Sequence, residues 1–231
     1  MQLTKLESPF LKYIIAKQFA PGERLPTLNE ISDELGVSIG KLREQLEVAR
    51  SLGLVSVRPR LGIQREVFDF NQIVLEGMLF SLATEETSFK QVSQLRQVIE
   101  IGFWHKAVVL LTSADKEQLR TLIAQAWLKL RGEPAHIPNF EHRAFHLTIY
   151  SRLDNPFVQG LLSAYWDAYD ASELTRFASY DYWIRVWTYH ERIVAALCDN
   201  NFDAGLILLQ EHFALLRPLP TTATDPLRNS I

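Results

Sequence analysis

The sequence predicts a mainly α fold, in which a small winged helix-turn-helix at the N-terminus precedes a larger all-helical bundle. Three observations carry this prediction: two short helices around a glycine turn, two strand-like runs directly after them, and only helical patterns from residue 71 onward. A chain of 231 residues with 47% hydrophobic residues can build two cores. We expect a winged helix-turn-helix domain over 1–68, a linker over 69–75, an all-helical domain over 76–217 and a disordered tail over 218–231.

The first helix is predicted over residues 5–19 and ends before Pro21-Gly22. A second helix begins at Thr27, because Thr27 and Glu30 have the spacing of a capping box, in which each side chain binds an exposed backbone amide. It ends at Gly36, since glycine is favoured just past a helix end. The apolar stripe of the first helix consists of Leu6, Phe10, Tyr13, Ile14 and Ile15.

A third helix begins after Ser38, which can cap it, and runs to about Ser51. Two short helices joined by a turn that contains glycine are typical of a helix-turn-helix. The runs 54–58 and 63–67 alternate like strands around the turn 59–62, and they predict a β-hairpin wing.

The charge of the chain is uneven. Residues 1–68 hold 10 Lys and Arg against 8 Asp and Glu, whereas the whole chain has a net charge of −3. A locally basic segment in an acidic protein favours contact with phosphates, although a solvated basic face would have the same composition. A recognition helix and a wing would present their side chains to base edges and backbone, so we predict DNA contacts from Thr27, Ser38, Lys41, Arg43, Arg58, Arg60 and Gly62.

The second half reads as helices throughout, with proline and Asn200-Asn201 at the joints. The segment Tyr165–Tyr189 contains nine aromatic residues, which we expect in a core or dimer interface, with one or two lining a pocket. The expected helices cover residues 71–84, 88–111, 113–131, 138–151, 155–170, 179–198 and 202–217.

Four of the six histidines form a geometric pattern. His142 and His146 are four residues apart on one helix and therefore share a face. His190 and His212 lie equally far, about 15 Å, from the turn at residue 201, so antiparallel packing sets them at the same height. Four imidazoles from three helices can hold a metal ion inside a bundle, although a single histidine is more often structural.

The N-terminal half resembles the GntR family of bacterial regulators. The resemblance rests on Pro21-Gly22-Glu23-Arg24-Leu25-Pro26, Leu35-Gly36-Val37-Ser38, Leu42-Arg43-Glu44-Gln45-Leu46 and Ser51-Leu52-Gly53-Leu54-Val55. It implies a homodimer that binds a palindromic operator in double-stranded DNA and responds to a small effector. The chain departs from the family at Ile39, where an arginine is usual, and at Arg60, where the wing tip usually carries glycine.

The helical half resembles the FCD effector domain of the FadR-like subgroup. In this domain an acidic residue four before a histidine, together with two later histidines, commonly binds metal, and His142 here takes the place of the acid. The metal set is thus predicted as His142, His146, His190 and His212. Four neutral imidazoles suit zinc, nickel or copper better than manganese, with zinc or nickel expected here.

Arg96 matches an Arg-x-x-x-Glu pattern whose arginine often faces the effector cavity in this domain. It is therefore a candidate to bind an anionic effector, and the alternative is a surface arginine paired with Glu100. Glu141 points about 100° away from His142 on its helix and is not expected to be a ligand. We expect His105 and His136 to be structural or exposed.

Two other classes of function compete with this prediction. A metal-dependent hydrolase on a helical bundle would need an acid or base beside the ion, and no such motif or nucleophile motif occurs. A ligand-independent DNA-binding protein would make the histidines incidental. A single cysteine, Cys198, fits a reducing cytosol, and no apolar run approaches the length of a membrane span, so we expect a cytoplasmic regulator and no enzyme.

Overall fold

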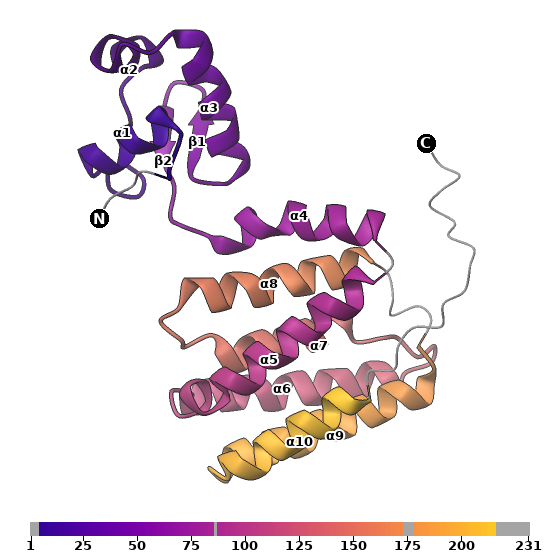
Figure 1. Ribbon diagram of the computed structural model, residues 1–231. Helices are drawn as coiled ribbons and strands as arrows, with labels where there is room; N and C mark the ends of the chain where they lie inside the picture. The colour runs from indigo at the N-terminus through magenta and orange to yellow at the C-terminus, as the bar shows by residue number, and fades with distance from the viewer. Residues whose placement is uncertain (1–4, 86, 173–177, 216–231) are drawn as a thin grey trace. The chain divides into compact units, whose positions relative to one another are not determined.

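The computed structural model describes residues 5–85, 87–172 and 178–215. It has the predicted mainly α fold, with one small antiparallel sheet near the N-terminus (Figure 1). The described residues form two compact units. The first contains the chain up to Thr84 together with Asp154–Ala171, and the second contains Glu85–Leu153 and the chain from Ser172 onward.

The first unit opens with helices α1 (Pro9–Lys17), α2 (Leu28–Leu35) and α3 (Ile39–Ser51). Helix α1 begins four residues later than predicted. Ser8 accepts a hydrogen bond from the amide of Leu11, and Pro9 occupies the first position, where its missing N–H costs nothing. Of the predicted apolar stripe, Ile15 is 48% exposed and therefore lies outside the core. The core of these helices includes Phe10, Ile31, Leu42 and Ala49, all fully buried.

The predicted caps of the next two helices are confirmed. Thr27 and Glu30 form both halves of the capping box of α2, and Gly36 ends that helix at a φ of +64°, a conformation that glycine adopts without strain. Ser38 caps α3 by accepting a hydrogen bond from the amide of Lys41. The turn between α2 and α3 is thereby determined by local contacts.

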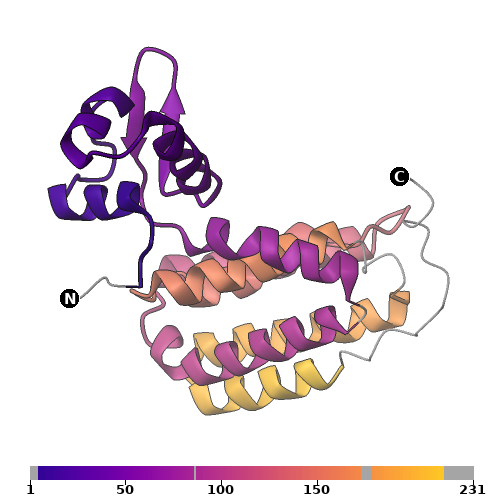
Figure 2. The same ribbon diagram turned by 45° about the horizontal axis from the view of Figure 1, so that its top comes forward.

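The wing is the hairpin of β1 (Val55–Arg58) and β2 (Gly62–Arg65). The strands are antiparallel, and Val55 pairs with Arg65. Val55 and Ile63 are buried in the core of the helices, whereas Val57, Arg58 and residues 59–61 of the turn are exposed. In Figure 2 the two purple strands extend beyond the neighbouring helices.

Helices α4 (Phe70–Thr84) and α8 (Pro156–Ala171) pack side by side in the first unit. Gly160 permits the close approach, because a Cβ there would lie 2.6 Å from the backbone nitrogen of Asn71. The side-chain amide of Asn71 donates to Asp167 at 2.8 Å. Residues 70–75 of the expected linker are thus the first turns of α4, while the domain boundaries themselves stay a prediction.

The second unit contains, among its described residues, helices α5 (Ser88–Val108), α6 (Ser113–Leu130), α7 (Asn139–Tyr150), α9 (Tyr180–Cys198) and α10 (Phe202–Ala214). They pack in a closed ring, in which α5 contacts α7 and α10, α6 contacts α7 and α9, and α9 contacts α10. Gly205 brings α10 close to α5, since a Cβ there would lie 2.7 Å from the ring of Trp104. This ring of helices surrounds the candidate metal centre.

Three expectations for this half differ from the structure or fall outside it. Helix α5 ends at Val108 rather than at residue 111. Helix α10 ends at Ala214 rather than 217, and residues 216–217 and the expected tail 218–231 lie outside the described residues. No described helix is both long and apolar enough to cross a membrane.

Candidate metal centre and nucleic-acid interface

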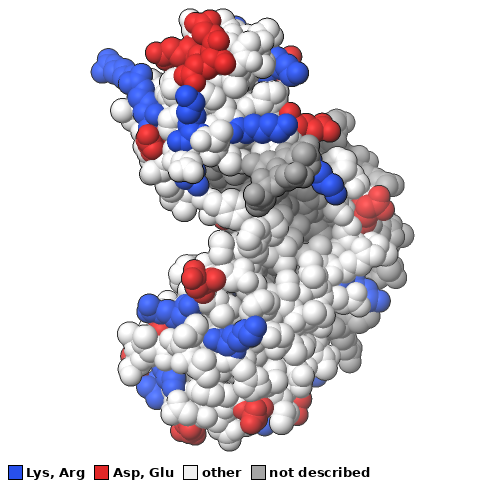
Figure 3. Space-filling view, turned by 60° about the vertical axis from the view of Figure 1, so that its left-hand side comes forward, with Lys and Arg blue, Asp and Glu red and all other residues white. Residues whose placement is uncertain are grey.

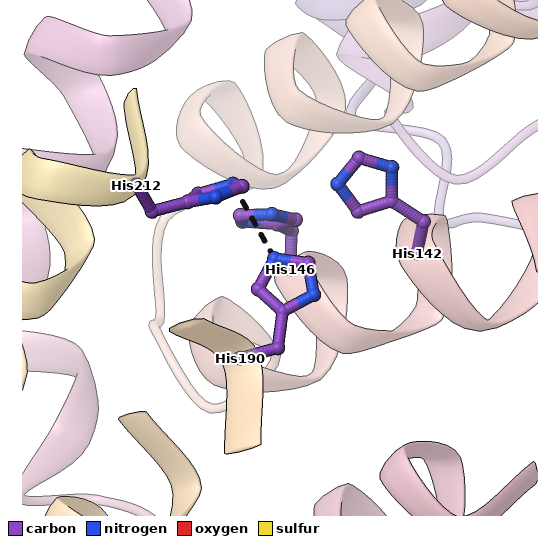
Figure 4. Close-up of side chains that lie close together, drawn as sticks. All are labelled: His142, His146, His190 and His212. Atoms are coloured by element: carbon purple, nitrogen blue, oxygen red, sulfur yellow. Dashed lines mark hydrogen bonds between the residues drawn. The ribbon is translucent and has the colours of Figure 1, made fainter. Parts of the chain in front are cut away.

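The structure brings the four predicted histidines together. His142 and His146 lie one turn apart on α7, His190 lies on α9 and His212 on α10, and none is more than 2% exposed. Each ring offers one nitrogen, and these four atoms all lie within 4.8 Å of one another. Figure 4 shows the rings converging on a common space from three helices. Residues that are up to 70 positions apart in the chain thus form one cluster.

The spacing of the ring nitrogens fits a transition metal. The Nε2 atoms of His190 and His212 are 3.3 Å apart (dashed in Figure 4), and two ligands of a tetrahedral zinc with Zn–N bonds of 2.0–2.1 Å are about 3.4 Å apart. The Nδ1 atoms of both rings have no hydrogen-bond partner among the described residues. Apart from the contact between the two rings, hydrogen bonding therefore does not explain why these imidazoles are buried, and the donor set fits a metal.

The protonation of the cluster favours metal binding as well. Burial holds the pKa of each of the four histidines well below its usual value, and the positive charge of Arg96 lowers it further. The four rings are consequently neutral near pH 7. Neutral imidazole is the form whose lone pair binds metal.

Helix α5 supplies two charged groups beside the cluster. Glu100, fully buried, accepts a hydrogen bond from Nδ1 of His146 at 2.8 Å, and its other oxygen accepts from Nε of Arg96 at 2.6 Å. A carboxylate that accepts from one ring nitrogen leaves the lone pair on the other, which orients a histidine for metal. Burial raises the pKa of Glu100, and the neighbouring Arg96 opposes that rise.

Arg96 is 2% exposed and has the expected partner in Glu100, but it is buried rather than on the surface. Its Nη2 atom lies 3.1 Å from Nε2 of His146, the nitrogen that carries the lone pair when Nδ1 donates to Glu100. From the sequence, Glu100 is predicted only as a partner of Arg96 and not as a site residue. The Arg-x-x-x-Glu spacing was the available signal, since it places both side chains on one face of α5.

The predictions for three further residues of this half agree with the structure. Glu141 turns away from the cluster and pairs with Lys129, whose Nζ atom lies 2.7 Å from its carboxylate. His105 is 53% exposed on its side chain and contacts Asp203 on α10, and His136 is exposed. None of these three residues belongs to the cluster.

Aromatic rings enclose the cluster. Phe145 stacks on His190 with ring centroids 4.2 Å apart. Trp183 lies edge-on to His142 at 5.7 Å, and Trp187 lies 4.8 Å from His190. Two members of the aromatic segment, Trp183 and Trp187, thus pack against the histidine rings.

The predicted DNA contacts lie on the helix-turn-helix and the wing. Thr27 and Ser38 cap α2 and α3, and the side chains of Lys41 and Arg43 are exposed on the first turns of α3. Ile39 is the first residue of α3 and is half-buried. The position at which the family usually has an arginine therefore holds an apolar, partly covered side chain here. The first turns of α3 consequently present two basic groups.

The wing adds exposed arginines at its tip. Arg58 and Arg60 are exposed, and Arg60 adopts a φ of +66°, which L-residues rarely take and glycine takes freely. Gly62 has a φ of +77° and lies against Arg24, whose Nε would be 3.2 Å from an added Cβ. Arg24 is a basic neighbour of the wing that the sequence did not single out. On the face drawn in Figure 3, basic and acidic side chains are interspersed, so no field of one sign covers it.

Two family models match the chain. The model described as "Bacterial regulatory proteins, gntR family" matches residues 11–64, and the model of the FCD domain matches residues 91–215. The first match covers α1 to the wing, and the second covers α5 to α10.

Individual proteins match as well. The HTH-type transcriptional regulator LutR of Bacillus subtilis is 25% identical over 63% of this chain, and the match spans 65% of LutR, just under two thirds of its length. The uncharacterized HTH-type transcriptional regulator YieP of Escherichia coli is 30% identical over 88% of this chain and 87% of its own. The solved structure of a Streptococcus agalactiae GntR, 17% identical, superposes with a TM-score of 0.62 over 89% of this chain and 93% of its own. This last likeness concerns the fold alone.

Proposed function

Because the chain belongs to the GntR family of bacterial regulatory proteins and carries an FCD domain, it is a DNA-binding transcriptional regulator and no enzyme, and we propose that a metal ion and a small carboxylate in its FCD domain control it. The observation that carries this proposal is the cluster of four buried histidines, whose ligand nitrogens lie within 4.8 Å of one another. Apolar side chains would pack the core at a lower cost than four buried imidazoles, so packing alone does not account for the cluster.

The donor set indicates which metal is held. His142, His146, His190 and His212 supply only neutral nitrogen ligands, which suit zinc, nickel or copper, with zinc or nickel our expectation. Bound there, the ion would act as a Lewis acid that attracts an anionic ligand. Glu100 orients His146 from outside the ligand set.

The charges favour an anionic effector. The histidines are neutral, so they leave the dipositive charge of an ion uncompensated, and the buried Arg96 and Glu100 cancel each other. Arg96 Nη2 contacts Nε2 of His146. The planar guanidinium of Arg96 lies beside the proposed ligand nitrogens and suits a carboxylate. Arg96 is therefore our candidate to bind the effector.

DNA recognition is assigned to the first turns of α3 and to the wing. In this proposal Thr27, Ser38, Lys41, Arg43, Arg58, Arg60 and Gly62 form the contact surface, with Gly62 and the two caps holding backbone geometry. A homodimer presents two copies of the surface to the half-sites of a palindromic operator about one helical turn apart. We place the regulator in the cytoplasm, where its DNA is.

The histidines also suggest how the signal could travel. His190 and His212 lie on α9 and α10, so a ligand at the cluster contacts two helices whose packing it can shift. A coupling of about 1–3 kcal/mol between effector and DNA is ordinary for such switches.

Metal analysis tests the first step of the proposal. We expect about one zinc or nickel per chain in the purified protein, because three helices converge on one set of ligands. His146→Ala should lose the metal, and chelation should lower the melting temperature of the wild type, since the ion binds only the folded bundle. The control is His105→Ala, an exposed histidine, which should keep its metal.

The proposal fails if the wild type purifies without metal and its melting temperature does not change on addition of zinc, nickel or a chelator. Retention of metal by His146→Ala at the wild-type level would also contradict the assignment of the ligands.

A further inference from the structure

Two buried tryptophans have indole N–H groups that no acceptor satisfies. Trp183 is 1% exposed and Trp187 is 0% exposed, and neither Nε1 atom has a hydrogen-bond partner among the described residues. An indole N–H can only donate, and a buried donor without an acceptor is costly. Native proteins retain such groups rarely, most often where water or a ligand completes them.

Both rings lie beside the histidine cluster. Trp183, Trp187 and His190 follow one another at spacings of four and three residues on α9, so they share its inward face. Trp183 approaches His142 with ring centroids 5.7 Å apart at 89°, and Trp187 lies 6.2 Å from His142 and 4.8 Å from His190. The two indole rings therefore border the proposed metal centre.

Other tryptophans of the same unit show the contrast. Trp104, also fully buried, donates its indole N–H to the carbonyl of Phe202 at 2.8 Å. Trp127 has no acceptor either, but it is half-buried in a surface groove of about 510 Å³ between α6 and α9. Within this unit, fully buried and unsatisfied indoles occur, among the described residues, only beside the histidines.

We propose that Trp183 and Trp187 form one wall of the effector site and donate their indole N–H groups to oxygens of a carboxylate that carries at least one further acceptor oxygen. This inference rests on the proposed function, since it assumes that an anion reaches the metal centre. The ion, Arg96 and the two indoles are spread over α5, α7, α9 and α10, so a ligand with oxygens at both ends matches them better than a simple monocarboxylate. The ring faces exclude water and limit the size of the ligand.

The test uses the metal-loaded full-length protein with acetate, glycolate and succinate as probes. Calorimetry gives the affinities, and ¹H–¹⁵N spectra follow the indole signals of the wild type. Glycolate or succinate should bind more tightly than acetate and should shift the Trp183 and Trp187 signals. Trp183→Phe and Trp187→Phe keep an aromatic wall but remove the donor, so each should weaken the tighter probe roughly tenfold or more. Trp127→Phe, the matched control, should leave its affinity unchanged.

A purely structural role predicts a different pattern. Each Phe variant loses an unsatisfied donor but leaves a small cavity, so the melting temperature of the anion-free protein should fall only modestly; lost affinity for the probes in a variant that still melts cooperatively supports a role in binding. If the probes bind the wild type but both variants bind them equally well, or if the indole signals do not move, this inference is wrong and the proposed function stands. If no probe binds the metal-loaded wild type, both fail.

Discussion

At the scale of single residues, Glu100 links the charges of the site. Its carboxylate accepts from His146 on one oxygen and from Arg96 on the other, and all three groups are buried. The first contact selects the tautomer of His146, and the second keeps a guanidinium from being buried without a partner. One acidic side chain thereby stabilises both a metal ligand and the candidate effector residue.

Replacing this carboxylate by an amide should weaken metal binding without dismantling the cluster. Glu100→Gln keeps the shape but removes the charge, so we expect zinc affinity to fall about 10–100-fold, measured by competition with a chelating dye. Glu141→Gln is the matched control, because that carboxylate is also buried but pairs with Lys129. Equal zinc affinity in Glu100→Gln and the wild type would show that Glu100 does not orient His146.

The histidines could be predicted from sequence, whereas the contact of Glu100 with His146 could not. His142 and His146 are related by one helical turn, and His190 and His212 by their symmetry about one turn of the chain, so local geometry suffices. The contact between Glu100 and His146 depends on how far α5 slides along α7, 46 residues away in sequence. That offset is decided by tertiary contacts, for example by the hydroxyl of Tyr150 on α7, which donates to the backbone carbonyl of Glu100 at 2.8 Å, and no local periodicity reports it.

At the scale of elements, the helix boundaries of the DNA-reading half could largely be predicted from local sequence. The capping box of α2 and the cap of α3 were predictable because they depend on residues three positions apart. The start of α1 differs from the prediction, since Ser8 caps the helix and Pro9 is its first residue, so the apolar Leu6 lies before the helix. The conformation of the wing tip also escaped prediction, because an arginine occupies a backbone position that favours glycine.

This unfavourable conformation suggests that Arg60 is retained for its charge. Arg60→Gly should relieve backbone strain and leave the melting temperature unchanged or higher, yet weaken DNA binding. Arg43→Ala should weaken binding too, and in both variants the dependence of affinity on salt should become shallower by about one unit of slope. Gel shifts across a salt series with the cognate upstream DNA measure both effects.

Arg50→Ala serves as the control for these variants, because Arg50 lies at the far end of α3 and pairs with Glu47. Unchanged affinity and slope in both Arg43→Ala and Arg60→Gly would mean that DNA contacts another surface of the domain.

At the scale of the whole molecule, regulation requires that ligand binding in the helical bundle changes the free energy of DNA binding. The sequence predicted both parts and their family, because each has its own motifs and periodicity. It did not predict that α8 packs with α4, since that pairing joins segments about 90 residues apart through Gly160 and Asn71. The coupling between the two parts is testable. Ligands that bind the histidine cluster should change the affinity for DNA, and DNA should change the affinity for these ligands by the same factor.

The most direct test measures DNA affinity in four states, with and without zinc and with and without succinate or glycolate. We expect the carboxylate to change the dissociation constant for operator DNA about 5–150-fold in the zinc-loaded protein and to have no effect in the metal-free protein. The DNA should change the affinity for the carboxylate by the same factor. A DNA affinity that stays the same in all four states would contradict control through the histidine cluster, even if the protein still binds its operator.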